Sequence, residues 1–188
     1  MEHAASFTGH RPRVGMAFDL RSAQTEMLER HLDRAVELLV RQQDVRYFLC
    51  GMASGFDLFA AQRVLRLRRS GVLPESVGVV AVLPYPDHSW DISGERWKRA
   101  YQEVLQCACD QVVVTQGKRK DSFRKRNEYL VRNADILIAY WNHDPRTGTG
   151  QTVRMAGKCT HCDQFIRFDA AGRAFLRKAV SMPCWWVK

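Results

Sequence analysis

The sequence lacks the apolar runs that mark membrane and secreted proteins. No uninterrupted apolar stretch approaches the roughly 20 residues that a helix needs to cross a bilayer. Residues 1–6 also lack the basic and then apolar pattern of a signal peptide. We therefore expect a cytoplasmic protein with no membrane partner. In that reducing compartment, its six cysteines would be thiols or metal ligands instead of disulfides.

Internal repeats and low-complexity linkers are also missing. The 188 residues therefore most simply form one domain that is large enough for a hydrophobic core. Acidic residues are outnumbered, because 29 Lys and Arg against 20 Asp and Glu give a net charge of +9. This excess favours anionic partners such as nucleotides, nucleic acid or acidic surfaces, and it does not choose among them.

Short apolar runs alternate with segments of helical periodicity over most of the chain. Strands are expected at 4–7, 45–50, 77–83, 112–115 and 136–141, and helices after Ser22 and from about 57, 94, 121 and 151. The run at 77–83 is nearly all apolar, which is typical of a strand buried on both faces. The alternation predicts an α/β fold of three layers, with a mainly parallel sheet and right-handed crossovers.

The pattern weakens after Ala156. We therefore place a ligand-binding domain at 1–157 and a C-terminal extension at 158–188, which either stands apart or continues the same domain. The extension is expected to hold a strand at 165–168 and a helix at 171–180.

One pair of cysteines in the extension has metal-ligand spacing. Cys159 and Cys162 match the two-residue spacing of a zinc knuckle, but a structural zinc site needs four ligands. A second Cys-x-x-Cys is absent, so the remaining ligands would have to come from Cys184, His161, His143, Cys107 or Cys109. Free thiols are the alternative, and both interpretations stay open.

The turn at residues 51–57, Gly-Met-Ala-Ser-Gly-Phe-Asp, joins an expected strand to an expected helix. Glycines there let the backbone approach a ligand, and the helix N-terminus offers N–H groups to a phosphate. Gly51, Ser54 and Gly55 are therefore candidate phosphate donors. Asp57 either caps the helix or binds a ribose hydroxyl. A tight turn with no ligand is the simpler alternative.

Two further loops follow expected strands, where ligands of parallel sheets bind. Thr8, Gly9 and Arg11 follow the first strand, and Arg11 can form a bidentate pair with a phosphate. A structural loop held by an Arg–carboxylate pair is the alternative there. Arg126 and Asn127 are candidate contacts that follow a basic run, whose other members are expected to form a diffuse rim.

Three motifs occur in order along the chain. They are Ser-Phe-Thr-Gly-His-Arg-Pro at 6–12, the turn at 51–57, and Arg126-Asn127 ahead of the apolar segment 134–139. Over residues 5–157 this set resembles the YpsA-like family of the SLOG superfamily, which also holds the LOG phosphoribohydrolases and the DprA proteins that load single-stranded DNA. The resemblance implies a Rossmann-like fold that binds a nucleotide or a nucleotide-derived ligand.

The last motif of this family is altered here. The family usually shows a Gly-Gly-Thr turn before its last helix, and this chain reads Thr147-Gly148-Thr149. The resemblance makes Gly148, Thr149 and Thr152 candidate ligand donors. Thr152 also stands where the hydrolytic LOG proteins carry a glutamate, and a threonine cannot act as a general base. This difference argues against LOG-type hydrolysis.

The sequence therefore predicts a protein that binds or senses a nucleotide-like small molecule without strong catalysis. An N-glycosidic-bond hydrolase or transferase is one alternative, with Asp57 as its best catalytic candidate and Asp87 and Glu128 behind it. DprA-like binding of single-stranded nucleic acid through the basic run 118–120 is another. Assembly into a homo-oligomer stays open.

Overall fold

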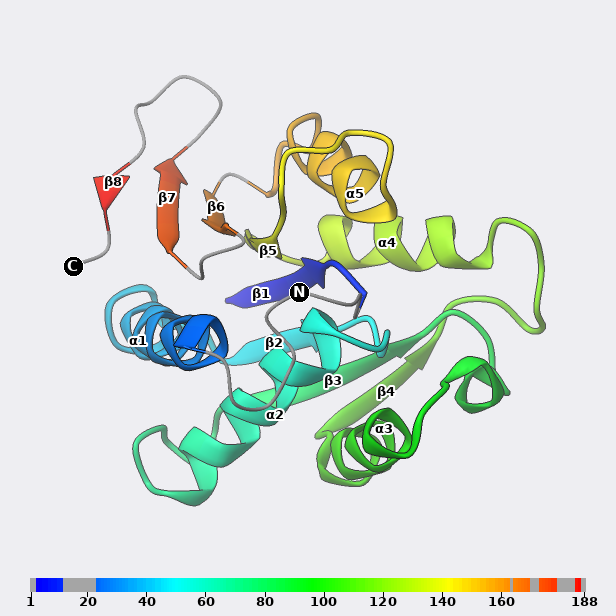
Figure 1. Ribbon diagram of the computed structural model, residues 1–188, viewed down its shortest axis with the longest axis horizontal. Helices are drawn as coiled ribbons and strands as arrows, with labels where there is room; N and C mark the ends of the chain where they lie inside the picture. Colours follow the sequence, from blue (N-terminus) through cyan, green and yellow to red (C-terminus); the bar gives the residue numbers. More distant parts are fainter. Residues whose placement is uncertain (1–2, 12–22, 163, 170–172, 179–184, 187–188) are drawn as a thin grey trace.

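The computed structural model describes residues 3–11, 23–162, 164–169, 173–178 and 185–186. These residues form one mixed sheet with helices on both faces (Figure 1). The strands are β1 (Ala4–Gly9), β2 (Tyr47–Cys50), β3 (Gly78–Leu83), β4 (Asp110–Val113), β5 (Ile136–Tyr140), β6 (Gln164–Phe168), β7 (Ala174–Lys178) and β8 (Trp185–Trp186). Pro12, Ser22 and Cys184, which the sequence pattern had singled out, lie outside the described residues.

The helices separate into two layers. The helices are α1 (Ala23–Gln43), α2 (Phe56–Arg69), α3 (Glu95–Cys107), α4 (Ser122–Arg132) and α5 (Gly148–Ala156), with a short 3₁₀ helix at His88–Asp91. Helices α1, α2 and α3 cover one face of the sheet, and α4 and α5 cover the other (Figure 1). None of the described helices combines the length and the apolar character needed to cross a membrane.

The strand order is β4-β3-β2-β1-β5-β6-β7-β8, and the pairings from β4 to β6 are all parallel. From β1 to β4, each new strand is added on the same side of the strand before it. Helix α4 then returns along the opposite face, so that β5 lies beside β1. The strand order reverses between these two strands, and ligands of open α/β sheets bind at the carboxyl ends of such a pair. The prediction of a Rossmann-like three-layer sandwich with a mainly parallel sheet is confirmed.

The strands alternate their side chains between the two layers. Phe7 and Phe48 face α1–α3, and their rings stack with centroids 5.7 Å apart. Leu49 and Val80 face the other way, where Leu130 of α4 covers them. Each of these large apolar side chains is fully buried, which stabilises the fold by about 1.5–3 kcal/mol apiece. This two-sided burial holds the carboxyl ends of the strands in fixed positions.

Two expectations from the sequence are wrong at the edges of the sheet. Residues 174–178 of the expected helix at 171–180 form β7, which pairs antiparallel with β6, with Ile166 opposite Leu176. An unpaired edge of β6 offers backbone donors and acceptors that a strand satisfies and a helix does not. Strand β4 also starts at Asp110, two residues before the expected start at 112. Its polar first residues are tolerated because they are exposed on an edge strand.

Candidate functional site

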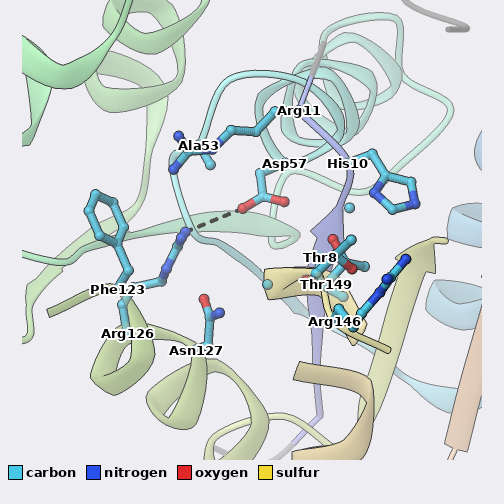
Figure 2. A pocket seen from close by; sticks show the side chains of 13 residues that line it. Thr8, His10, Arg11, Ala53, Asp57, Phe123, Arg126, Asn127, Arg146 and Thr149 are labelled. Carbon is cyan, nitrogen blue, oxygen red and sulfur yellow. Dashed lines mark hydrogen bonds and ion pairs between the residues drawn. The ribbon is translucent and has the colours of Figure 1, made fainter. Parts of the chain in front are cut away.

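A cavity of about 370 Å³ opens beyond the carboxyl end of β1 (Figure 2). This volume lies within the range of about 300–1,000 Å³ that is usual for small-molecule sites. Four segments from distant parts of the chain enclose it, which are the β1 loop, the turn before α2, the first half of α4 and the start of α5. Its lining consists of Thr8, Gly9, His10, Arg11, Ala53, Asp57, Phe123, Arg126, Asn127, Arg146, Thr147, Gly148 and Thr149.

The structure brings together most of the residues that the sequence nominated for a ligand site. Those that line the cavity are Thr8, Gly9, Arg11, Asp57, Arg126, Asn127, Gly148 and Thr149. The other four candidates, Gly51, Ser54, Gly55 and Thr152, are not part of the lining. Each of these four residues lies elsewhere and makes other contacts in the structure.

Gly51 lies directly beneath Arg126. The Arg126 guanidinium donates a hydrogen bond from Nη1 to the carbonyl oxygen of Gly51, and the same atom is 3.3 Å from Asp57 Oδ2. A Cβ atom at residue 51 would overlap Nη1. The glycine is therefore required for this close approach, and its carbonyl binds the arginine.

Arg126 and Asp57 form a buried ion pair, and Figure 2 shows the arginine directed from α4 at the carboxylate. Each side chain is only 6% exposed. Burial raises the pKa of Asp57 to about 6, although the positive charges of Arg126 and Arg11 act in the opposite direction. Burial likewise lowers the pKa of Arg126. Within the described residues, Arg126 Nε has no hydrogen-bond partner.

The charge of the lining is positive. Three guanidinium groups, on Arg11, Arg126 and Arg146, surround a single carboxylate among the described lining residues, that of Asp57. Arg11 lies over the Phe123 ring, with its guanidinium carbon 5.7 Å from the ring centroid. The arrangement favours an anion in the cavity.

The N-terminus of α5 adds backbone donors to the same cavity. Thr147 caps this helix, because its Oγ1 accepts a hydrogen bond from the Gly150 N–H at 3.0 Å. In the described part of the chain, the N–H groups of Gly148 and Thr149 have no acceptor, and both residues line the cavity. Free N–H groups and the positive end of the helix dipole are suited to a phosphate.

The model of the YpsA family, whose description reads YspA SLOG family, matches residues 5–167. The chain belongs to the YspA SLOG family. The resemblance inferred from the three sequence motifs is thereby confirmed. No curated protein matches the chain.

Among solved structures, the chain is similar to DNA processing protein A from Helicobacter pylori, whose structure was described for its single-stranded DNA binding mode. The TM-score is 0.55 and the sequence identity 18%. The match covers 88% of this chain and 64% of that one, so this chain spans less than two thirds of its structural neighbour. At this identity the likeness supports the Rossmann-like fold.

The altered turn of this YspA SLOG member keeps its capping geometry. Thr147 has an extended backbone with φ −76°, which any residue adopts, so a glycine is not required at this position. Its hydroxyl also donates to the Asp144 carbonyl at 2.9 Å. By contrast, a Cβ at Gly150 would overlap the carbonyl of Asp144. Thr147 thus supplies the cap, and Gly150 allows the close packing of the turn.

Thr152, Ser54 and Gly55 have other positions in this YspA SLOG structure. Thr152 is fully buried and donates to the Gly148 carbonyl within α5 at 2.9 Å. Gly55 precedes α2 with φ 99°, a conformation that favours glycine. Ser54 lines a neighbouring cavity instead of this one.

Five lining residues were missed by the sequence-based site: His10, Ala53, Phe123, Arg146 and Thr147. His10 Nε2 accepts a hydrogen bond from the Asn142 N–H at 3.1 Å, which ties the β1 loop to the loop after β5. Arg146 is 88% exposed and pairs with Asp144 at 3.1 Å. In the sequence, the feature that could have identified Arg146 as a site residue is its position as a cation directly before the threonine-glycine turn.

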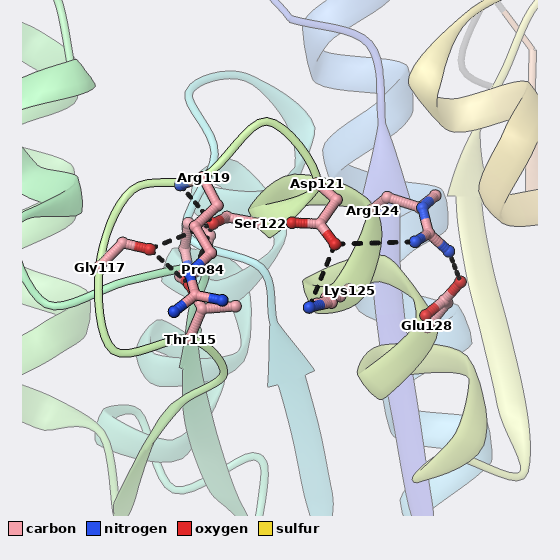
Figure 3. Close-up of polar contacts among 9 residues, drawn as sticks. All are labelled: Pro84, Thr115, Gly117, Arg119, Asp121, Ser122, Arg124, Lys125 and Glu128. Atoms are coloured by element: carbon pink, nitrogen blue, oxygen red, sulfur yellow. Dashed lines mark hydrogen bonds and ion pairs between the residues drawn. The ribbon is translucent and has the colours of Figure 1, made fainter.

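Much of the basic run beside the cavity is paired with acidic residues (Figure 3). Arg124 and Lys125 both pair with Asp121, at 3.8 and 3.1 Å, and Arg124 also pairs with Glu128. At the beginning of the run, Lys118 pairs with Asp91 at 2.6 Å. Among the described residues, the side chains of Arg119 and Lys120 have no ion pair, so they carry the remaining exposed charge of the run.

The described residues do not supply a set of metal ligands around Cys159 and Cys162. No group of three or more His, Cys, Asp or Glu side chains is close enough there to hold a metal. Cys159 Sγ lies 3.9 Å from the Val131 carbonyl, and Cys162 packs in the core between α4, α5 and β5. A zinc site would need ligands such as Cys184 from outside the described residues, and it stays a prediction.

Proposed function

We propose that this YspA SLOG protein binds a nucleotide or a nucleotide-derived small molecule, with a phosphate in the cavity beyond β1. The observation that carries the proposal is the convergence of two kinds of donor on one cavity. The open N-terminus of α5 supplies the N–H groups of Gly148 and Thr149. The guanidinium groups of Arg11, Arg126 and Arg146 supply positive charge.

The buried Arg126 supports an anion at this place. Its Nε is buried and has no partner in the described chain, and such an unsatisfied donor costs about 1–3 kcal/mol. Asp57 and Asp144 pair with Arg126 and Arg146, so Arg11 keeps an unpaired positive charge in the described chain, and the raised pKa of the Asp57 carboxyl reduces its negative charge near pH 6. A phosphate would therefore meet a preformed excess of donors.

Titration calorimetry with pyrophosphate, AMP and adenosine tests the proposal. We expect the two phosphate compounds to bind and adenosine to bind far more weakly. Arg146→Ala should weaken AMP binding at least about tenfold, because a hydrogen bond to a charged group contributes about 1.5–3 kcal/mol. Arg99→Ala is the matched control, since Arg99 is 77% exposed, pairs with Glu95 and lies away from the cavity. Failure of every phosphate compound to bind would refute the proposal.

Binding without strong catalysis fits the carboxylates of the site. Among the described lining residues only Asp57 is acidic, and it is buried against Arg126. Glu128 is paired with Arg124, and Asp87 is not in the lining. Incubation with AMP should release no adenine above the uncatalysed rate. Release that is abolished by Asp57→Asn would instead support the hydrolase.

Single-stranded nucleic acid is a second candidate ligand. The unpaired charges of Arg119 and Lys120 lie just before α4, the helix whose first half lines the cavity, and the structural neighbour from Helicobacter pylori binds single-stranded DNA. This candidate predicts that a thymidine oligonucleotide binds more tightly than AMP and that its affinity falls steeply with salt. Replacement of both Arg119 and Lys120 by Gln should then reduce the salt slope by about 2. Tighter binding of AMP than of the oligonucleotide would exclude it.

A further inference from the structure

A second cavity, of about 460 Å³, adjoins the first. The two share three lining residues, Arg11, Ala53 and Phe123, so they are neighbouring compartments divided by the Arg11–Phe123 contact. The turn before α2 serves both compartments, because Asp57 faces the first and Ser54 faces the second.

The walls of the second cavity are more apolar than those of the first. Trp97 and Ile92 are almost fully buried and line it, and the Phe123 ring forms the side toward the first cavity. The polar groups of its lining are Ser54, Ser93, His88, Arg11 and the ion pair of Lys118 with Asp91. Aromatic and aliphatic walls with a few polar groups are usual where a ring system binds.

His88 lines the second cavity as a neutral polar group. It is 2% exposed, and its ring contacts the rings of Tyr85, Tyr101 and Phe123. Its Nδ1 has no hydrogen-bond partner among the described residues. Burial lowers the pKa of His88 to about 4, and the charge of Arg126 acts in the same direction. The imidazole is therefore uncharged at neutral pH and suits an uncharged polar ligand group.

Two of the three charged side chains that line the second cavity, Lys118 and Asp91, neutralise each other. Lys118 pairs with Asp91 at 2.6 Å, and Asp91 also accepts a hydrogen bond from the Tyr85 hydroxyl. Arg11 is then the lining cation that remains unpaired in the described structure, and it lies on the border with the first cavity. An anion would bind in the first cavity or at this border, and the second cavity favours an uncharged group.

We infer that the second cavity holds the heterocyclic base of the ligand whose phosphate occupies the first cavity. The ligand would extend across the Arg11–Phe123 contact, with its sugar beside Ala53. The ligand class is then a base-bearing nucleotide, as opposed to free phosphate or a phosphorylated sugar. This inference rests on the proposed function, because the phosphate places the rest of the molecule.

Calorimetry with AMP and ribose 5-phosphate tests the inference, since the two differ only in the base. The wild type should bind AMP at least tenfold more tightly. Ser93→Trp would fill the second cavity from its exposed side, so it should remove that advantage and leave ribose 5-phosphate binding unchanged. Ser76→Trp is the matched control, because Ser76 is also exposed, lies before β3 and lines neither cavity.

Three outcomes are distinguishable. Equal affinities of the wild type for AMP and ribose 5-phosphate would overturn the inference and leave the proposed phosphate site standing. A tenfold preference for AMP that Ser93→Trp does not change would also overturn it, because the base would then lie elsewhere. If neither compound nor pyrophosphate binds, the proposed function fails, and the inference fails with it.

Discussion

At the scale of single residues, the contact with Gly51 holds Arg126 in place, and Arg126 lines the first cavity. The sequence suggested that Gly51 donates its N–H to a phosphate. In the structure its carbonyl accepts a hydrogen bond from Arg126, and the missing side chain leaves room for the guanidinium. In the proposed site, Gly51 would therefore act on a ligand through the arginine that it positions.

Gly51→Ala should displace Arg126 and separate it from Asp57. Breaking a buried ion pair destabilises a protein by about 3–5 kcal/mol, so we expect a loss of that order in the free energy of unfolding. Urea denaturation measures it. Gly148→Ala is the matched control, because a Cβ there has no neighbour within 4 Å, and the change should stay within about 1 kcal/mol. Similar effects of the two substitutions would contradict this role of Gly51.

Asp57 should make stability depend on pH in a distinctive direction. Burial raises its pKa from 3.8 to about 6, so between these values the folded protein binds more protons than the unfolded chain. Its contribution to stability is therefore full below about pH 4 and is lost as the pH rises through 6, and it amounts to about 3 kcal/mol. His88, whose pKa is lowered to about 4, has the opposite effect over the same range.

The comparison with Asp57→Asn isolates this group, because the variant cannot titrate at position 57. The free energy of unfolding of the wild type minus that of Asp57→Asn should decrease as the pH rises from 4 to 6.5. Urea denaturation at each pH measures both values. His88 is present in both proteins, so its contribution cancels. A difference that grows with pH would show that the ion pair with Arg126 holds the pKa of Asp57 low.

The sequence predicted those site residues whose position follows from the strand they terminate. Thr8 and Gly9 end β1 and Arg11 follows it, so the parallel sheet alone places them at its carboxyl edge. Ser54 and Gly51 lie in a turn, where a side chain or carbonyl can face either cavity or the core. That choice depends on the contact of this turn with Arg126 of α4, and a local pattern contains no such information.

At the scale of secondary-structure elements, the start of α5 provides the backbone donors of the proposed anion site. The helix is short and begins in a turn that Thr147 caps, with Gly150 packed against Asp144. The sequence indicated a helix only from about residue 151, because Gly148 and Gly150 are weak helix formers. The structure starts it three residues earlier, so that Gly148 and Thr149 are in its first turn.

Thr147→Val should loosen this turn, since valine keeps the shape of threonine and lacks the hydroxyl that accepts from Gly150. We expect about 1 kcal/mol lower stability and several-fold weaker AMP binding, because the Gly148 and Thr149 donors lose their fixed positions. Denaturation and calorimetry measure the two effects. Thr147→Ser restores the hydroxyl and should recover both. If serine and valine behave alike, the cap does not organise the site.

The end of the sheet shows why some elements cannot be read from local sequence. Residues 174–178 read Ala-Phe-Leu-Arg-Lys, which are compatible with a helix, and the sequence analysis assigned one there. Strand β6 presents an unpaired edge at this place, and β7 completes its hydrogen bonds in an antiparallel register. Tertiary pairing outweighs a weak helical propensity here.

At the scale of the whole molecule, the first cavity joins segments from both halves of the chain. Residues 8–11, 53–57, 123–127 and 146–149 meet there although they are separated by long stretches of sequence. Helices from both faces of the sheet contribute, α2 from one side and α4 and α5 from the other. A bound anion would therefore contact elements that assemble only in the complete fold, and the unfolded chain would have no such site.

Ligand binding should consequently raise the melting temperature of the whole protein. At a pyrophosphate concentration of 100 times Kd, linkage adds about 2.7 kcal/mol of stability. For a protein of this size that corresponds to a rise of about 5–11 °C.

The double variant Arg11→Ala/Arg146→Ala, which removes two cations of the lining, should lose most of this rise. The control Arg66→Ala/Arg99→Ala removes two exposed arginines outside the cavity and should keep it. Because both variants lower the net charge by two, a general effect of charge would reduce the rise equally in both. Only a binding site at the first cavity would reduce the rise in melting temperature in the first double variant and preserve it in the control.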